Sequence, residues 1–327
     1  MSSRRQQHRG RARYRLFALP PLALAAAGAL AGCGLGPGKT PTGVQLQVTR
    51  EFGAQPMRSL AAPQAHGQET VMSLLMRNAT VATRYGGGFV QSIDGRSGGF
   101  RGSQPTAWFY YVNGVQAPKG AAETNVLPGD RIWWDLHDWS QTEEVAAVVG
   151  SFPEPFVNGI EGRRPPVRLE CAAPEATPCR TVAARLRAVG VNAGLAALAP
   201  GGEAPETLRL LVGTWQQLRN DPGADQLEHG PGASGVYARV LGGGRSFALL
   251  DAQGQVTRTL SGSAGLVAAT RYTGEDPEWL ITGTDTAGLE LAAHAVREST
   301  LHDRFAIALL PGAAGASSVL PLPQPAP

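Results

Sequence analysis

The sequence predicts two domains of different fold class, an α+β domain over residues 43–145 and an α/β domain with a mixed sheet over residues 167–311. Two observations support this division. The first region combines strand patterns and aromatic residues with one short helix, whereas the second alternates apolar strands with helices. Between them, residues 146–166 are rich in proline, which favours an extended and fairly stiff junction.

Residues 1–33 have the composition of an export signal rather than that of a folded domain. Six arginines and no acidic residue precede an apolar run over residues 16–31, which is shorter than the roughly 20 residues that a transmembrane helix needs. The run ends in Leu30-Ala31-Gly32-Cys33, which resembles the lipobox of bacterial lipoproteins. That resemblance implies a fatty acid such as palmitate on Cys33, and an extracytoplasmic protein anchored to the bacterial cell membrane. An ordinary signal peptide, or an uncleaved anchor with a chance cysteine, is the alternative.

Removal of the signal changes both the net charge and the cysteine count. Six of the 29 basic residues lie in residues 1–33, so 23 remain against 26 acidic residues, a net charge of about −3. This balance gives a nucleic-acid partner no electrostatic support. With Cys33 lipidated, Cys171 and Cys179 remain, and we expect them to form a disulfide. A metal site is the rival, but no histidine lies near enough in the sequence to complete one.

The two ends of the mature chain have the composition of unfolded segments. Residues 34–42 are rich in glycine and proline, which predicts a tether between the lipid and the folded part. Residues 312–327 are rich in glycine, alanine, serine and proline, and we expect a disordered tail there.

The sequence predicts several strands and a single helix in the first region. Residues 44–48 alternate apolar and polar, as in a strand with one buried face. Val71, Leu74 and Leu75 fall at helical spacing, which predicts an amphipathic helix over residues 70–79. Residues 108–112 and 131–136 form two further strands, with turns at Asn113-Gly114 and at residues 128–129.

Aromatic residues crowd into this hairpin region. Neighbouring residues on a strand point to opposite faces, so Trp133 and Trp134 cannot both enter one core, and we expect one of them to face outward or to line a groove. The alternatives are a thin sheet that uses large side chains to fill its core, and an exposed aromatic platform for a flat ligand. The candidate ligand-binding residues of this region are Trp108, Tyr110, Tyr111, Asn113, Trp133, Trp134 and Trp139.

The same residues carry a family resemblance. The stretches 108–114, 120–121 and 127–134, together with the preceding helix at 69–75, resemble domain-of-unknown-function family 4430, which is similar to the C-terminal domain of transcobalamin and intrinsic factor. The resemblance covers roughly residues 43–139 and implies a β-grasp-like fold. In the transcobalamin group this domain covers one face of cobalamin and a helical barrel covers the other. No segment here resembles that barrel, so a corrinoid would need the second domain or a partner protein as its other wall.

The second region is predicted to contain strand-turn-helix units. Strands at residues 208–212 and 279–282 each lead through a Gly-Thr turn into a helix, and a strand at residues 167–171 precedes a helix at 181–189. Ligands often bind beyond the carboxyl ends of such strands, which makes Thr214, Thr284 and Asp285 candidate contacts. The alternative is that these three residues are ordinary helix N-caps. Strands at 235–241, 246–251 and 256–260 lie between the two units and make the sheet mixed.

No catalytic motif fits its context. The string from Gly230 to Gly235 matches the dinucleotide fingerprint, but it does not follow a strand and it leads into a strand rather than a helix. Nucleophile-elbow, zinc-protease and phosphate-loop patterns do not occur, so we do not expect an enzyme. Asp135 and His137 could share a strand face as a metal pair, although a solvated strand end explains them equally well.

Three hypotheses follow for the function. The first is a membrane-anchored binding module that delivers a corrinoid or another small ligand to a membrane importer. The alternative is a structural or interaction lipoprotein that docks another envelope protein through its aromatic face. An enzyme of a type without recognisable motifs is the third.

Overall fold

The computed structural model describes residues 43–61, 68–199, 206–272, 275–313 and 316–326, all within a single compact unit. The predicted lipobox, the predicted lipidation of Cys33 and the predicted tether lie outside these residues. Within the described part of the chain, no helix is both long and apolar enough to cross a lipid bilayer.

The first region is built on a mixed sheet with the strand order β2-β1-β9-β7-β6, in which β8 also pairs with β7. Its central pair, β1 and β9, is parallel, and the other pairs are antiparallel. A smaller antiparallel sheet, β3-β4-β5, lies beside it. The elements are β1 (Gln45–Arg50), β2 (Gln55–Ala61), α1 (Val71–Asn78), β3 (Val81–Arg84), β4 (Phe89–Ile93), β5 (Arg96–Ser97), β6 (Gly99–Arg101), β7 (Gln104–Val112), β8 (Val115–Gln116) and β9 (Arg131–Asp138).

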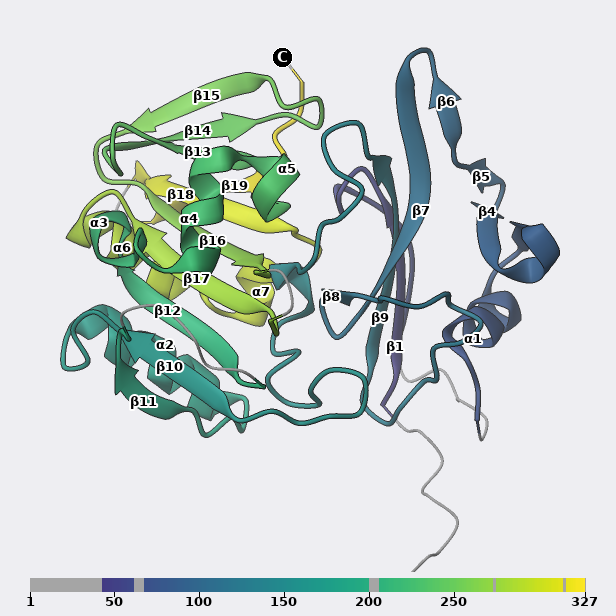
Figure 1. The fold of residues 1–327 in the computed structure, drawn as a ribbon, viewed down its shortest axis with the longest axis horizontal. Coiled ribbons are helices and arrows are strands. Elements are labelled where there is room, and N and C mark those ends of the chain that lie inside the picture. The colour runs from purple at the N-terminus through teal and green to yellow at the C-terminus, as the bar shows by residue number, and fades with distance from the viewer. Residues whose placement is uncertain (1–42, 62–67, 200–205, 273–274, 314–315, 327) are drawn as a thin grey trace, which may run out of the picture. The chain divides into compact units, whose positions relative to one another are not determined.

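Helix α1 forms where the apolar spacing predicts it. Thr70 caps its first turn in a capping box with Ser73, and Val71, Leu74 and Leu75 are buried. These side chains pack against one face of the sheet, in a hydrophobic core that includes Trp134. Figure 1 shows α1 on the side of this sheet that faces away from the second region.

The second region contains a seven-stranded sheet with the order β11-β10-β12-β17-β16-β18-β19. Strands β11, β10, β12 and β17 are parallel, and β16, β18 and β19 are antiparallel, so the sheet is mixed as predicted. The strands predicted at residues 235–241, 246–251 and 256–260 are not what makes it mixed, because they pair with one another in a separate sheet. Its elements are β10 (Val167–Cys171), α2 (Thr177–Ala188), β11 (Gly194–Ala197), β12 (Leu208–Thr214), α3 (Trp215–Leu218), α4 (Pro222–His229), α5 (Pro231–Ser234), β16 (Gly265–Thr270), β17 (Glu278–Gly283), α6 (Thr286–Ala295), α7 (Glu298–Leu301), β18 (Ala306–Pro311) and β19 (Ser317–Leu322).

Both faces of this sheet are covered. Helices α2 and α6 pack on one face, in a core that contains Val182, Leu186 and Ala292. The other face carries α3 to α5 and a three-stranded sheet of β13 (Ala238–Leu241), β14 (Ser246–Leu250) and β15 (Val256–Ser261). A disulfide joins Cys171 to Cys179, as the cysteine count predicts, and ties the end of β10 to the first turn of α2.

The expectation of a disordered tail over residues 312–327 was wrong. Strand β19 pairs with β18 from Ala306↔Leu322 to Pro311↔Ser317 and closes the edge of the large sheet. Leu322 is buried in the core. A composition rich in serine and proline hides this short strand, because an edge strand needs only a few apolar side chains to be held in place.

The proline-rich junction is not an extended linker either. Its residues form consecutive turns and the 3-10 helix η2 (Val149–Ser151). Phe152 and Phe156 are buried, and their rings lie 5.9 and 5.0 Å from the ring of Trp279. The apolar residues between the prolines therefore draw the segment into the core of the second region.

The expectation that either Trp133 or Trp134 faces outward was also wrong. The two side chains do point to opposite faces of β9, but each is only 2% exposed. Trp134 packs beneath α1, whereas Trp133 joins a core that includes Tyr237 and Phe305 of the second region. The first sheet therefore has a hydrophobic core on each face. This agrees with the alternative in which large side chains fill the core, and not with an exposed aromatic platform.

Candidate functional site

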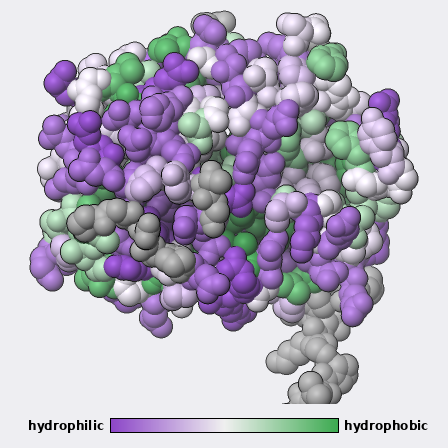
Figure 2. Space-filling model, viewed as in Figure 1, coloured by the Kyte–Doolittle hydropathy of each residue, from purple (hydrophilic) through white to green (hydrophobic). Residues whose placement is uncertain are grey.

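Two clefts lie along the contact between the first sheet and the second region. The first, which we call the polar cleft, has a volume of about 850 Å³. The second, of about 780 Å³, is lined by His137 and is called the His137 cleft. On the face drawn in Figure 2, hydrophilic side chains predominate, and hydrophobic surface is visible inside a hollow near the middle.

The His137 cleft is formed by six segments that are far apart in the sequence. The turn after β1, the start of β7 and the end of β9 come from the first region. The turn between β14 and β15, residues 302–304 and the segment 321–326 come from the second. The cleft therefore exists only when both regions are folded against each other.

A buried carboxylate within β9, that of Asp135, holds His137 in place at this cleft. Asp135 accepts hydrogen bonds from the amides of Phe52 and Gly53, each at 2.9 Å, and from the Thr49 hydroxyl. The Thr49 oxygen itself accepts the indole N–H of Trp133 at 2.7 Å, which leaves its proton free for Asp135. Since Asp135 receives these donors as a carboxylate, the His137 Nδ1 atom, 2.9 Å away, donates to it.

The imidazole of His137 is held between aromatic rings. Phe52 and Phe109 stack on its two faces, each with ring centroids 4.5 Å away, and Phe305 meets its edge at 5.4 Å. The side chain is 2% exposed. With Nδ1–H directed to Asp135, Nε2 carries the lone pair, and among the described residues it has no hydrogen-bond partner. His137 thus offers the cleft one fixed acceptor.

Acidic and basic side chains also line the His137 cleft. Asp138 is buried and accepts a hydrogen bond of 2.9 Å from Gln253 of the second region. Arg50 and Arg304 also line the cleft, and Arg304 donates to the Thr300 carbonyl oxygen. The arrangement suits a ligand with an apolar body and a few polar substituents.

The polar cleft is crossed by two ion pairs. Arg163 lies 2.9 Å from Asp276, and Arg271 lies 2.6 Å from Glu144. Each pair joins the segment that follows β9 to the large sheet of the second region. Three further carboxyl groups line the cleft: Glu161, Glu206 and Glu275.

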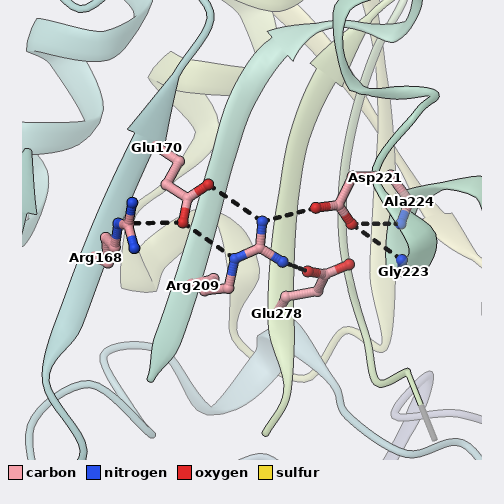
Figure 3. Close-up of polar contacts among 7 residues, drawn as sticks. All are labelled: Arg168, Glu170, Arg209, Asp221, Gly223, Ala224 and Glu278. Carbon is pink, nitrogen blue, oxygen red and sulfur yellow. Dashed lines mark hydrogen bonds and ion pairs between the residues drawn. The ribbon is translucent and has the colours of Figure 1, made fainter. Parts of the chain in front are cut away.

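A third polar feature is a buried charge cluster beneath α4. The guanidinium of Arg209 on β12 contacts Glu170 on β10, Glu278 on β17 and Asp221 at the start of α4 (Figure 3). All four side chains are 8% exposed or less. The cluster is not in either cleft, but the segments that follow Asp221 and precede Glu278 both line the polar cleft.

The structure assigns structural roles to most of the predicted site residues of the first region. Trp108 is buried and donates to the Arg96 carbonyl oxygen, and Tyr111 is fully buried. Tyr110 bonds the Lys119 carbonyl oxygen and Thr124, and its ring stacks on Trp134. Asn113 adopts a positive φ of 55° in the turn and bonds Asp130 and the amide of Arg131. Trp139 is partly buried, just after β9.

The three predicted contacts of the second region hold the ends of helices and strands. Thr214 forms a capping box with Gln217 at the start of α3, and Asp285 accepts the Gly288 amide at the start of α6. Thr284 accepts the Ala264 amide and donates to the Gly262 carbonyl oxygen. None of the three lines either cleft.

The proposed metal pair is an intramolecular hydrogen bond. Asp135 and His137 do share a face of β9, but they bond each other. In the described ranges, no group of three or more histidine, cysteine, aspartate or glutamate side chains could hold a metal ion. The residues that complete the site, Phe52, Phe109 and Phe305, were missed because no local pattern marks rings that come from three separate segments of the chain.

Residues 68–138, from just before α1 to the end of β9, match the family model Domain of unknown function (DUF4430), which is the family that the sequence resembles. No curated protein matches the sequence. A solved structure with some likeness is that of a "putative metal binding protein" from Ruminococcus gnavus. It is 18% identical, with 30% of this chain and 97% of that chain covered and a TM-score of 0.25, and we draw no conclusion from it.

Proposed function

We propose that this protein is an extracytoplasmic lipoprotein, anchored to the cell membrane through Cys33, whose folded part binds a small ligand in the His137 cleft. The single observation that carries the binding proposal is the Asp135–His137 pair, in which a buried imidazole is clamped between two phenylalanine rings with one nitrogen left for a ligand. A side chain fixed in this way loses little freedom on binding, which favours affinity.

The order of the first sheet supports a β-grasp-like assignment for the first domain. Two antiparallel strands, β1 and β2, precede α1, and β9 then pairs in parallel with β1 at the centre of the sheet. Together with the family match, this arrangement makes a corrinoid the first ligand to test. The second region, which forms the far side of the His137 cleft, is then the wall that replaces the helical barrel of the transcobalamin group.

In this proposal the anchor keeps the binding domain beside the membrane, where it would pass its ligand to an importer. Docking of another protein through the aromatic face is less well supported, because Trp108, Trp133 and Trp134 are all buried.

The test uses the chain that begins at Gly34. Micromolar cyanocobalamin is added to it, and binding is measured by the change in the visible spectrum and by calorimetry. Binding is expected in the wild-type chain, and His137→Ala is expected to weaken it about tenfold, the effect of one lost hydrogen bond. His294→Ala, at an exposed histidine of α6, is the matched control.

If the wild-type chain gives neither a spectral change nor heat, the corrinoid proposal is wrong. If it binds but His137→Ala and His294→Ala behave alike, the ligand binds elsewhere and the assignment to the His137 cleft is wrong.

A further inference from the structure

The buried charge cluster contains more carboxyl groups than its cation can balance. Arg209 carries one positive charge, and it faces the side chains of Glu170, Asp221 and Glu278. Arg168, on the same strand as Glu170, adds a second cation 3.3 Å from it, but that side chain is 38% exposed. On the other neighbouring strand, β16, the residue directly opposite Glu278 is the uncharged Thr270. A buried carboxylate without a compensating cation is costly, so the excess of negative charge in the cluster needs an explanation.

The hydrogen-bond donors in the cluster show that Glu278 is the carboxyl group whose negative charge is not compensated. Arg209 Nε donates to Glu170 at 3.1 Å, and its terminal nitrogens donate to Glu170, to Asp221 at 2.7 Å and to Glu278 Oε2 at 2.6 Å. The other oxygen of Asp221 accepts the amides of Gly223 and Ala224. Among the described residues, Glu278 Oε1 accepts no donor at all, although it is fully buried.

The neighbour of this oxygen is a second carboxyl group. Glu278 and Asp221 accept from the same Arg209 guanidinium, at 2.6 and 2.7 Å, and both carboxyl groups lie against Gly223, so a hydrogen bond between them is within reach. Two carboxylates cannot form such a bond, because neither has a hydrogen to donate. The contact also depends on Gly223, where a Cβ atom would lie only 1.7 Å from Glu278 Oε1.

We propose that Glu278 and Asp221 share one proton at neutral pH, and that this proton holds the start of α4 on the large sheet. The proton lies on Glu278 Oε1, which donates to the Asp221 carboxylate. Asp221 in turn caps α4 through the Gly223 and Ala224 amides (Figure 3). The cluster then carries Arg209 against two carboxylates rather than three.

The proton is coupled to the polar cleft through the chain on both sides of the cluster. Residues of α4 and α5, among them Gln226 and Ser234, form one wall of that cleft, and residues 275–277 lead directly into Glu278. When the proton is lost, Asp221 and Glu278 repel each other across the first turn of α4. The α4–α5 wall is the element that this repulsion loosens.

The raised pKa of Glu278 sets the pH range over which the shared proton stabilises the protein. Burial, and next the negative charge of Asp221, raise the pKa of Glu278 from 4.5 to about 8, against the opposing effect of Arg209. A raised carboxyl pKa means that the folded protein holds a proton that the unfolded chain releases above pH 4.5. The stabilisation is therefore complete below that pH, and it is lost as the pH rises towards 8.

The experiment compares the full chain in detergent with its Glu278→Gln variant between pH 5 and pH 9. The unfolding constant of the wild-type chain is divided by that of the variant. This ratio is expected to rise about tenfold per pH unit up to pH 8 and then to level off, because unfolding releases one proton in that range. Asp225→Asn, at a carboxyl of α4 that is 52% exposed, is the control and is expected to follow the wild type.

Two measurements on the wild-type chain need no variant. Infrared spectroscopy is expected to show a protonated carboxyl band at pH 7 that disappears by pH 9. Hydrogen exchange, corrected for intrinsic rates, is expected to increase in α4 and α5 relative to α6 over the same range. A ratio of unfolding constants that does not change with pH, or the absence of the infrared band, would overturn the shared proton. Equal exchange in α4 and α6 would overturn the coupling to the cleft wall.

Discussion

His137 and Arg209 show how single residues gain a role from their surroundings. His137 is one of six histidines in the sequence and lies in no recognisable motif, yet Asp135 and two phenylalanine rings fix its orientation at the cleft. Arg209 lies in a strand whose other side chains are largely apolar, yet it is the centre of the buried charge cluster. For both residues, most of these neighbours come from other segments of the chain.

Arg209→Met is expected to destabilise the protein strongly. Removal of the guanidinium leaves buried carboxylates without a cation, which costs about 3–5 kcal/mol of unfolding free energy. Denaturant unfolding at pH 7 measures this loss.

Arg168→Met is the matched control, because Arg168 contacts the same Glu170 carboxylate from a more exposed position. It is expected to cost less than about 1 kcal/mol. Equal losses for the two variants would show that Arg209 does not compensate the cluster.

At the level of elements, short signals at the ends of helices and strands set their boundaries. The capping box of Thr70 and Ser73 starts α1, and Asp221 and Asp285 start α4 and α6. Residues 312–327 show the limit of such reasoning. Their composition predicts disorder, and the pairing of β19 with β18 overrides it.

Thr70→Ala is expected to lower the free energy of unfolding by about 1 kcal/mol, because it removes the acceptor for the Ser73 amide. Ser73→Ala removes the reciprocal acceptor for the Thr70 amide. The double variant is expected to cost less than the sum of the two single variants, since each change breaks the same box. If thermal or chemical unfolding shows that the losses of the two single variants add up to that of the double variant, Thr70 and Ser73 do not act as one capping box.

At the level of the whole molecule, the first sheet and the second region share one hydrophobic core. The ring of Phe305, just before β18, lies 5.2 Å from the rings of Phe52 and Trp133 and 5.5 Å from that of Tyr111. These contacts cover the face of the first sheet that α1 leaves free. The clefts lie along this contact, so binding and stability depend on the same packing.

Phe305→Ala is expected to destabilise the protein by about 3–5 kcal/mol, because it leaves a cavity in this shared core. In the wild-type chain, tryptophan fluorescence and far-ultraviolet circular dichroism are expected to report one coincident unfolding transition. Four of the six tryptophans lie in residues 108–139, so fluorescence reports mainly on the first region.

Phe100→Ala is the control, since that ring is 79% exposed, and it is expected to change stability by less than about 0.5 kcal/mol. Two separate transitions in the wild-type chain would show that the two regions unfold independently.

The sequence by itself determined the local structure of this protein. Apolar patterns predicted α1 and strands such as β1, β7, β9, β12 and β17, the Gly-Thr turns predicted the strand-turn-helix units, and two cysteines predicted the disulfide. Strands β16, β18 and β19 of the large sheet and the short strands of the first region were not predicted. The tertiary structure alone decided that Trp133 and Trp134 are both buried and that a cleft forms around His137. Periodicity states which side of a strand is apolar, but not what covers it. Gln253, which bonds Asp138 at that cleft, lies 115 residues further along the chain.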